Sequence, residues 1–156
     1  MKKLRFLFLI YTGTVFVFLG GCNSLDKGSD KKLKENTKIC PQCHMELPDS
    51  NIHTTILHDK NEQHYFDDAG CMILWFSKNN TDLNAVTTEV FTNDTYKYIK
   101  ASTAHYKINE KTPMLYGFSA YENIQEGSIF YDEVVIRMRR GEHMANPKIR
   151  KQILGY

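Results

Sequence analysis

Residues 6–19 form a nearly continuous apolar run, FLFLIYTGTVFVFL, behind a basic start that contains Lys2, Lys3 and Arg5. A helix needs about 20 apolar residues to cross a bilayer, so this run is too short for a membrane span. A basic start, a short apolar region and small residues at its end are typical of a secretory signal peptide. The sequence therefore predicts that residues 1–21 are removed and take no part in the fold.

The apolar run ends in Leu19-Gly20-Gly21-Cys22. This ending resembles the lipobox of bacterial lipoproteins, in which the cysteine thiol receives a diacylglycerol and becomes the new N-terminus. Lipid chains on Cys22 would hold the protein at a membrane, because each buried methylene contributes about 0.8 kcal/mol. An ordinary signal peptide that contains a cysteine is the alternative. We expect a lipid-anchored protein in an extracytoplasmic (periplasmic) location.

Residues 22–38, CNSLDKGSDKKLKENTK, are polar and charged, and this composition predicts a flexible tether behind the lipidated cysteine. The 118 residues that remain, 39–156, suit one small domain or two closely packed lobes. Without residues 1–21 the chain has 17 basic and 18 acidic residues. This near balance gives no sign of nucleic-acid binding, which calls for a markedly basic domain.

The segment Cys40-Pro41-Gln42-Cys43-His44-Met45 places two thiols, an imidazole and a thioether within six residues. With Cys22 lipidated, the cysteines left are Cys40, Cys43 and Cys71. An odd count outside the cytoplasm leaves at least one thiol without an internal disulfide partner. A Cys40–Cys43 disulfide beside a buried Cys71 is one interpretation, and oxidising compartments favour it.

Met45 distinguishes between the metals that this segment could bind. Zinc takes thiolate, imidazole and carboxylate ligands in a tetrahedron, whereas Cu(I) accepts thiolate and thioether together. Cys43 and Met45 are two residues apart, so an extended chain would point both side chains to one side. Pro41 favours a turn that brings Cys40 towards Cys43. The spacing indicates a soft-metal site of low coordination number, with packing as the alternative role for Met45.

The rest of the chain alternates between strand-like and helix-like patterns. Residues 52–57 and 63–66 predict two strands around a polar turn at 59–62. Asp67 or Asp68 is predicted to cap a buried helix that follows at once. The later elements that we expect are strands at 85–91, 96–101, 105–108, 114–121 (with Gly117 allowing a bulge) and 128–131, and a helix at 132–140 with Val134, Val135 and Met138 inward.

The carboxyl end is basic, with Arg137, Arg139, Arg140, Lys148, Arg150 and Lys151 close together in sequence. Such a cluster is either a solvated face or a docking surface for an acidic partner or lipid head groups.

Four segments of this chain, in this order, resemble the NosL family of copper-binding lipoproteins, which assist the assembly of nitrous oxide reductase. The segments are Cys22, residues 40–45 (CPQCHM), residues 66–72 (FDDAGCM) and residues 112–117 (TPMLYG). The resemblance extends from the anchor to about residue 140. The family often has glycine before the methionine of its first motif, where this chain has His44.

The resemblance implies an α+β fold of two small ββαβ-type lobes packed together, similar to organomercurial lyase. The first lobe would be residues 39–95 with the CxxCxM loop, and the second would be residues 96–156 with a basic C-terminal tail. The resemblance also implies a metallochaperone, not an enzyme, that delivers Cu(I) to an extracytoplasmic cuproenzyme. Nitrous oxide reductase is the foremost recipient, and an ABC-type maturation or export complex is the working partner.

The candidate metal ligands are sulfur and imidazole groups: Cys43, Met45, Cys40, His44 and Met114, with Cys71 and Met72 as possible further ligands. Packing in an apolar helix is the alternative role for the last two. Two other functions stay open. A thiol–disulfide oxidoreductase would use Cys40 and Cys43 and needs a thiol of lowered pKa. A structural zinc site would combine the three cysteines with a histidine such as His64.

Overall fold

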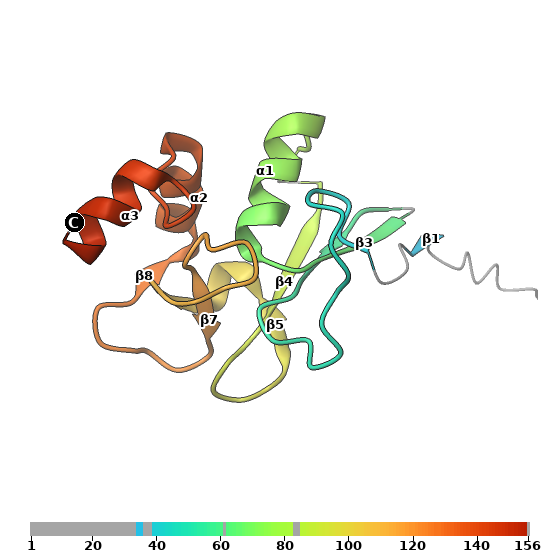
Figure 1. Ribbon diagram of the computed structural model, residues 1–156. Coiled ribbons are helices and arrows are strands. Elements are labelled where there is room, and N and C mark those ends of the chain that lie inside the picture. Colours follow the sequence, from blue (N-terminus) through green and yellow to red (C-terminus); the bar gives the residue numbers. More distant parts are fainter. Residues whose placement is uncertain (1–33, 36–38, 61, 83–84, 156) are drawn as a thin grey trace, which may run out of the picture. The chain divides into compact units, whose positions relative to one another are not determined.

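The computed structural model describes residues 34–35, 39–60, 62–82 and 85–155 (Figure 1). The predicted signal peptide, Cys22 and most of the predicted tether lie outside the described residues. Residues 31–156 form one compact unit. Within the described ranges, no helix has the length and apolar character that a membrane crossing requires.

Five strands form the first sheet, in the order β1-β3-β2-β4-β5. Their bounds are Lys34–Glu35 (β1), Thr55–His58 (β2), Glu62–Phe66 (β3), Thr87–Phe91 (β4) and Tyr98–Lys100 (β5). The pairs β2–β3, β2–β4 and β4–β5 are antiparallel, and β1 joins β3 in parallel. The register of β2 and β3 aligns Thr55 with Phe66, which confirms the predicted hairpin.

Helix α1, Ala69–Asn79, follows β3 almost directly. The carboxylate of Asp68 caps its N-terminus by accepting a hydrogen bond from the Gly70 N–H at 2.8 Å. Because the segment is apolar nearly all round, the first part of the helix is buried. The buried residues are Ala69, Gly70, Cys71, Met72, Ile73 and Phe76. The predicted order of strand, strand, helix and strand is confirmed, with Asp68 as the cap.

The second sheet has the order β7-β6-β8 and is antiparallel. Its strands are His105–Lys107 (β6), Ser119–Tyr121 (β7) and Ile129–Phe130 (β8), and a short 3-10 helix at Ala101–Thr103 precedes β6. Helix α2, Tyr131–Arg140, follows β8 and packs beside α1 (Figure 1). Val134 and Met138 are buried, as predicted for this helix, and Val135 is half-buried.

One prediction for the second half was wrong, and one helix was not predicted. Only residues 119–121 of the expected strand 114–121 form a strand, because the chain turns before it. In that turn the Leu115 N–H donates to the Thr112 carbonyl at 3.0 Å, and Leu115 and Gly117 have positive φ angles of 58° and 88°. The expected basic tail contains a third helix, α3, at Pro147–Leu154. Asn146 caps α3 by accepting a hydrogen bond from the Lys148 N–H at 3.1 Å.

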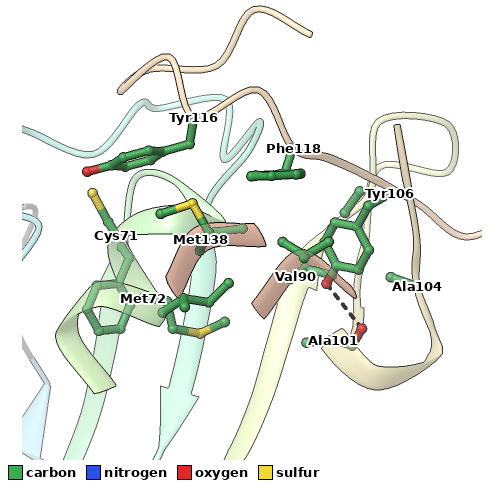
Figure 2. Packing of buried hydrophobic residues seen from close by; sticks show 14 of the residues in the cluster. Cys71, Met72, Val90, Ala101, Ala104, Tyr106, Tyr116, Phe118 and Met138 are labelled. Atoms are coloured by element: carbon green, nitrogen blue, oxygen red, sulfur yellow. Dashed lines mark hydrogen bonds between the residues drawn. The ribbon is translucent and has the colours of Figure 1, made fainter. Parts of the chain in front are cut away.

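One buried core joins the two sheets and the helices α1 and α2 (Figure 2). Its members include Leu57, Phe66 and Val90 from the first sheet, Tyr106 and Ala120 from the second, and Met72, Val134 and Met138 from the helices. The Asn93 N–H donates to the Ala120 carbonyl at 2.8 Å, which links the end of β4 to β7. The described residues therefore form a mixed fold with two small sheets and three α-helices, compatible with the α+β class.

Candidate metal centre

Residues 39–46 form a short loop that presents the two cysteines of the CxxC motif. Ile39 and Glu46 pair as an antiparallel bridge at its base. Within the loop the Cys40 N–H donates to the Met45 carbonyl, and the His44 N–H donates to the Cys40 carbonyl, both at 2.9 Å. The tight turn leaves Cys40 fully buried and Cys43 only half-buried.

His44 occupies the one position of this turn with a positive φ, 63°. Glycine adopts this left-handed conformation without steric cost, and histidine is among the few other residues enriched there. The His44 side chain is exposed. His44, where the NosL pattern often has glycine, therefore lies at a position whose backbone conformation favours glycine.

Four potential metal ligands meet at the inner side of the loop. They are the sulfurs of Cys40, Cys43 and Cys71 and a carboxylate oxygen of Asp67, and all lie within 4.8 Å of one another. The Cys43 thiol donates to Asp67 Oδ2 at 3.2 Å. All three cysteines are free thiols. This group of three thiols and one carboxylate could hold a metal ion.

The junction between β3 and α1 supplies two of the four ligands. Phe66, the last residue of β3, is fully buried and holds the chain against the core. Asp67 comes next, just before the helix, and Cys71 lies in the first turn of α1, four residues further on. The ligand atoms of both residues lie within 4.8 Å of the Cys40 and Cys43 sulfurs.

Cys40 is the most acidic of the three thiols. Its pKa is lowered to about 7, above all because the Cys71 thiol donates a hydrogen bond to its sulfur, although burial opposes this. Backbone N–H groups, including that of Cys43, add to the effect. Burial raises the pKa of Cys43 to about 12. The hydrogen bond that Cys71 donates to Cys40, together with burial, raises the pKa of Cys71. Cys40 is therefore the thiol of this cluster that loses its proton most readily.

Asp67 provides a test of whether this donor set suits a cation. Its Oδ1 atom is buried and has no hydrogen-bond partner, while its other oxygen accepts from Cys43. A buried carboxylate oxygen without a partner is costly, and a bound cation would satisfy it. Three thiolates and a carboxylate are donors that soft and borderline metals accept. The residues present therefore fit a metal of this class.

The predicted motif at residues 112–117 packs against the start of α1. The Met114 N–H donates to Asp68 Oδ2 at 3.3 Å, and burial raises the pKa of Asp68 to about 6. The Tyr116 ring covers Gly70 so closely that an added Cβ there would lie 2.3 Å from a ring carbon. Figure 2 shows Tyr116 next to Cys71. This motif therefore forms part of the surroundings of the thiol cluster.

The structure brings some predicted ligands together and leaves others apart. Cys40, Cys43 and Cys71 converge, and Asp67 joins them although the sequence assigned it to helix capping. No histidine among the described residues belongs to this donor group. His44 is exposed, whereas His64 lies 3.2 Å from Glu62 and contacts the Trp75 ring at a tilt of 40°, with ring centroids 5.0 Å apart.

The three methionines that were predicted as metal ligands have three different environments. Met45 is 47% exposed at the end of the loop. Met114 is half-buried and is held near the site through its backbone bond to Asp68. Met72 is fully buried in the core. Of these three, Met45 is the most accessible to a ligand or partner arriving from solvent.

No family model matches this sequence, and neither a curated protein nor a solved structure matches it. The function of the site therefore has to come from its own geometry and chemistry.

Proposed function

We propose that this protein is a membrane-anchored carrier of Cu(I) outside the cytoplasm. The ion would be held by Cys40, Cys43 and Cys71, with the Asp67 carboxylate beside it. The observation that supports this proposal most is the convergence of three free thiols and a carboxylate within 4.8 Å. Thiolate ligands select soft ions, and Cu(I) is the softest of the common biological candidates.

The difference in burial among the three thiols suggests how the ion is transferred. Cys40 and Cys71 are fully buried, whereas Cys43 is half-buried and Met45, two residues on, is 47% exposed. The buried pair keeps the ion in place while Cys43 exchanges with an incoming sulfur or nitrogen donor of the partner. Met45 supplies a weak thioether on the solvent side, which suits entry and exit of the ion.

The resemblance to the NosL family supplies the proposed partners. Three of its four segments surround the thiol cluster: the loop at residues 40–45, the helix start within residues 66–72, and residues 112–117 packed against that start. This common location supports the resemblance. We therefore propose a cuproenzyme, nitrous oxide reductase foremost, as recipient, an ABC-type complex as working partner and Cys22 as lipid anchor. Of the two ββαβ-type lobes that the resemblance implies, the first is supported by the order β2-β3-α1-β4, whereas the described residues of the second half have the order β6-β7-β8-α2 without a strand after α2.

The thiol chemistry argues against an oxidoreductase. Such an enzyme needs an accessible thiol of lowered pKa as the attacking group. Here the thiol of lowered pKa, Cys40, is fully buried, and burial raises the pKa of the more accessible Cys43. A carrier without catalytic activity is the better fit to this arrangement.

Structural zinc is the second candidate, and the Asp67 carboxylate favours it. Three thiolates and one carboxylate make the four ligands of a tetrahedral zinc site. A structural zinc ion contributes folding free energy, so its removal by a chelator would unfold the protein. We expect the metal-free protein to stay folded, because the core cluster consists mostly of residues outside the site and includes only Cys40 and Cys71 from it.

The decisive experiment is an anaerobic titration of residues 31–156 with Cu(I), in competition with a chromophoric chelator. We expect wild type to compete, Cys43→Ser to bind about tenfold more weakly or worse, and Met45→Leu to show a smaller loss. Met72→Leu is the control, since it removes a core sulfur next to Cys71. If wild type and Cys43→Ser bind equally weakly, the site assignment is wrong. Tight binding of zinc together with weak binding of Cu(I) would favour the second candidate.

A further inference from the structure

The carboxyl-terminal helices carry a charged surface that the metal site does not use. Between residues 136 and 155 the chain has six basic residues and one acidic residue, Glu142. Two of the basic residues bind groups of the protein: Arg137 Nε pairs with Glu133 at 2.8 Å, and Arg150 Nε donates to the Met144 carbonyl at 2.9 Å. The other four are exposed and form no ion pair with a residue that the structure describes. They are Arg139, Arg140, Lys148 and Lys151.

Exposed apolar side chains lie on the same helical stripes as these cations. Ile136, 41% exposed, precedes Arg139 and Arg140 by three and four residues on α2. Leu154, 50% exposed, follows Lys151 by three residues on α3, and Lys151 follows Lys148 by three. Residues with this spacing are neighbours on one helix face. Helix α3 has no buried residue, so its apolar side chains remain partly accessible to solvent.

The position of α3 is set by its connection to α2. The Asn146 side chain donates to the Gly141 carbonyl at 2.8 Å, and the Met144 N–H donates to the Tyr116 carbonyl at 3.2 Å. These bonds hold the connecting segment on the body of the protein. The two helices, drawn in orange to red in Figure 1, therefore have fixed positions on the body of the protein.

The charge of the remaining chain has the opposite sign. Residues 39–130 contain twelve acidic and six basic residues, whereas residues 131–155 contain three acidic and six basic residues. An anionic surface would attract the carboxyl-terminal helices and repel the rest of the body. Because of this charge asymmetry, an anionic surface would bind the protein in one orientation, with the carboxyl-terminal helices towards the surface.

We propose that α2 and α3 form a docking surface for an anionic phospholipid bilayer. This basic helical surface consists of Arg139, Arg140, Lys148 and Lys151 together with Ile136 and Leu154. The cations contact lipid head groups, and each contributes about a fivefold gain in binding near such a surface. The two apolar side chains enter the boundary between head groups and acyl chains. This insertion favours a bilayer over an acidic protein, which would need only the charges.

Vesicle sedimentation tests the proposal on residues 31–156, the unit that has its own core. This fragment lacks Cys22, so any binding comes from the protein surface. The vesicles are phosphatidylcholine alone and phosphatidylcholine mixed with phosphatidylglycerol, at low and at high salt. The variant is the fourfold change Arg139→Gln, Arg140→Gln, Lys148→Gln and Lys151→Gln. The matched control changes four exposed lysines of the body to glutamine: Lys60, Lys78, Lys100 and Lys111.

We expect wild type and control to bind the anionic vesicles at low salt and to leave the neutral ones in solution. The fourfold variant should bind about tenfold more weakly or worse, and high salt should release wild type. The pair Ile136→Ser and Leu154→Ser should weaken vesicle binding and leave binding to polyglutamate unchanged. Equal loss in the variant and the control would overturn the proposal, as would binding to polyglutamate without binding to vesicles. Circular dichroism of each variant checks that the helices persist.

Discussion

Cys71 has the position for two roles, because its side chain is fully buried in the core and its sulfur lies within 4.8 Å of the other three donor atoms. A cysteine in an apolar helix usually behaves as a small hydrophobic residue. Here the start of the helix directs this residue towards the CxxC loop, and the Cys71 thiol donates a hydrogen bond to the Cys40 sulfur. Burial therefore does not exclude a ligand role.

The substitution Cys71→Ala separates these two roles. We expect it to weaken Cu(I) binding about tenfold or more, because one of three thiolates is lost. The free energy of unfolding of the metal-free protein should fall by only about 1 kcal/mol, since one buried atom is removed. Competition with a chelator measures the first quantity, and urea unfolding measures the second. An unchanged affinity would reduce Cys71 to a packing residue.

His44→Gly tests the backbone of the loop. The left-handed conformation at His44, with φ of 63°, costs a non-glycine residue about 1 kcal/mol, part of which is offset by the greater entropy of an unfolded glycine. We expect the variant to be more stable by about 0.5 kcal/mol and to bind Cu(I) as wild type does. Glu46→Gly, at an exposed position without positive φ, is the control and should lose stability. A weaker affinity of His44→Gly would instead identify the imidazole as a ligand.

The sequence could predict part of the site and not the rest. Cys40 and Cys43 lie in one short motif, so their proximity follows from local geometry. Asp67 lies 24 residues after Cys43, and its contact with that thiol depends on how β3 and α1 pack against the loop. The sequence offered a sufficient local role for the acidic pair, helix capping, which Asp68 alone performs. Nothing local in the sequence distinguishes the two carboxylates.

Helix α1 and the segment at residues 112–117 meet at Gly70, and this contact positions Cys71. A Cβ at Gly70 would lie 2.3 Å from Tyr116 Cδ2 and 2.9 Å from Met138 Cε. Alanine is favoured over glycine by about 1 kcal/mol in a helix, but an overpacked site costs about 1–3 kcal/mol. We therefore expect Gly70→Ala to destabilise the protein by about 1 kcal/mol, measured by urea unfolding.

A double-mutant cycle identifies the cause of that loss. In a Tyr116→Ala background, Gly70→Ala should cost less than in wild type, because the ring that the new methyl group meets is absent. Ser77→Ala, at an exposed position of the same helix, is the control and should change stability little. Equal costs of Gly70→Ala in both backgrounds would mean that Tyr116 does not hold the helix start.

The elements that the sequence predicted well have strong local patterns. The hairpin of β2 and β3 and the apolar helix α1 each combine a clear period with a turn or cap signal. The strand expected at 114–121 failed because Leu115 and Gly117 turn the backbone, a preference that apolar alternation does not reveal. Helix α3 was not predicted, because the basic residues of its segment indicate a charged surface and do not by themselves specify a secondary structure. Asn146 followed by Pro147 is nevertheless a helix-start signal.

At the scale of the whole molecule, His53 makes a contribution to stability that is lost in mild acid. Burial lowers its pKa below the ordinary value of 6.5, although the charge of Glu110 opposes this, and its Nδ1 lies 3.4 Å from Ser119 Oγ. A lowered folded-state pKa means that the unfolded chain binds the proton more readily. This contribution to stability is therefore present above pH 6.5 and is lost as the pH falls through the lowered folded-state pKa.

His53→Asn tests this pH dependence without straining the chain, since asparagine tolerates the positive φ of 68° at this position. Unfolding by urea is measured at neutral pH and in mild acid. We expect the variant to lose less stability than wild type on acidification. His143, whose pKa burial lowers, and Asp68, whose pKa burial raises to about 6, remain in both proteins and make the same contributions of opposite sign in each. Identical losses in the two proteins would show that His53 titrates alike in the folded and unfolded states.

At the scale of the whole molecule, we propose that the fold places sulfur around a soft ion at an accessible edge of the protein. X-ray absorption spectroscopy on Cu(I)-loaded residues 31–156 measures this directly, because it counts the sulfur and lighter donors around the metal. We expect a shell dominated by sulfur from Cys40, Cys43 and Cys71, which loses one sulfur in the Cys43→Ser variant. A shell of nitrogen and oxygen without sulfur, or no ion retained after desalting, would contradict the proposed role as a copper carrier.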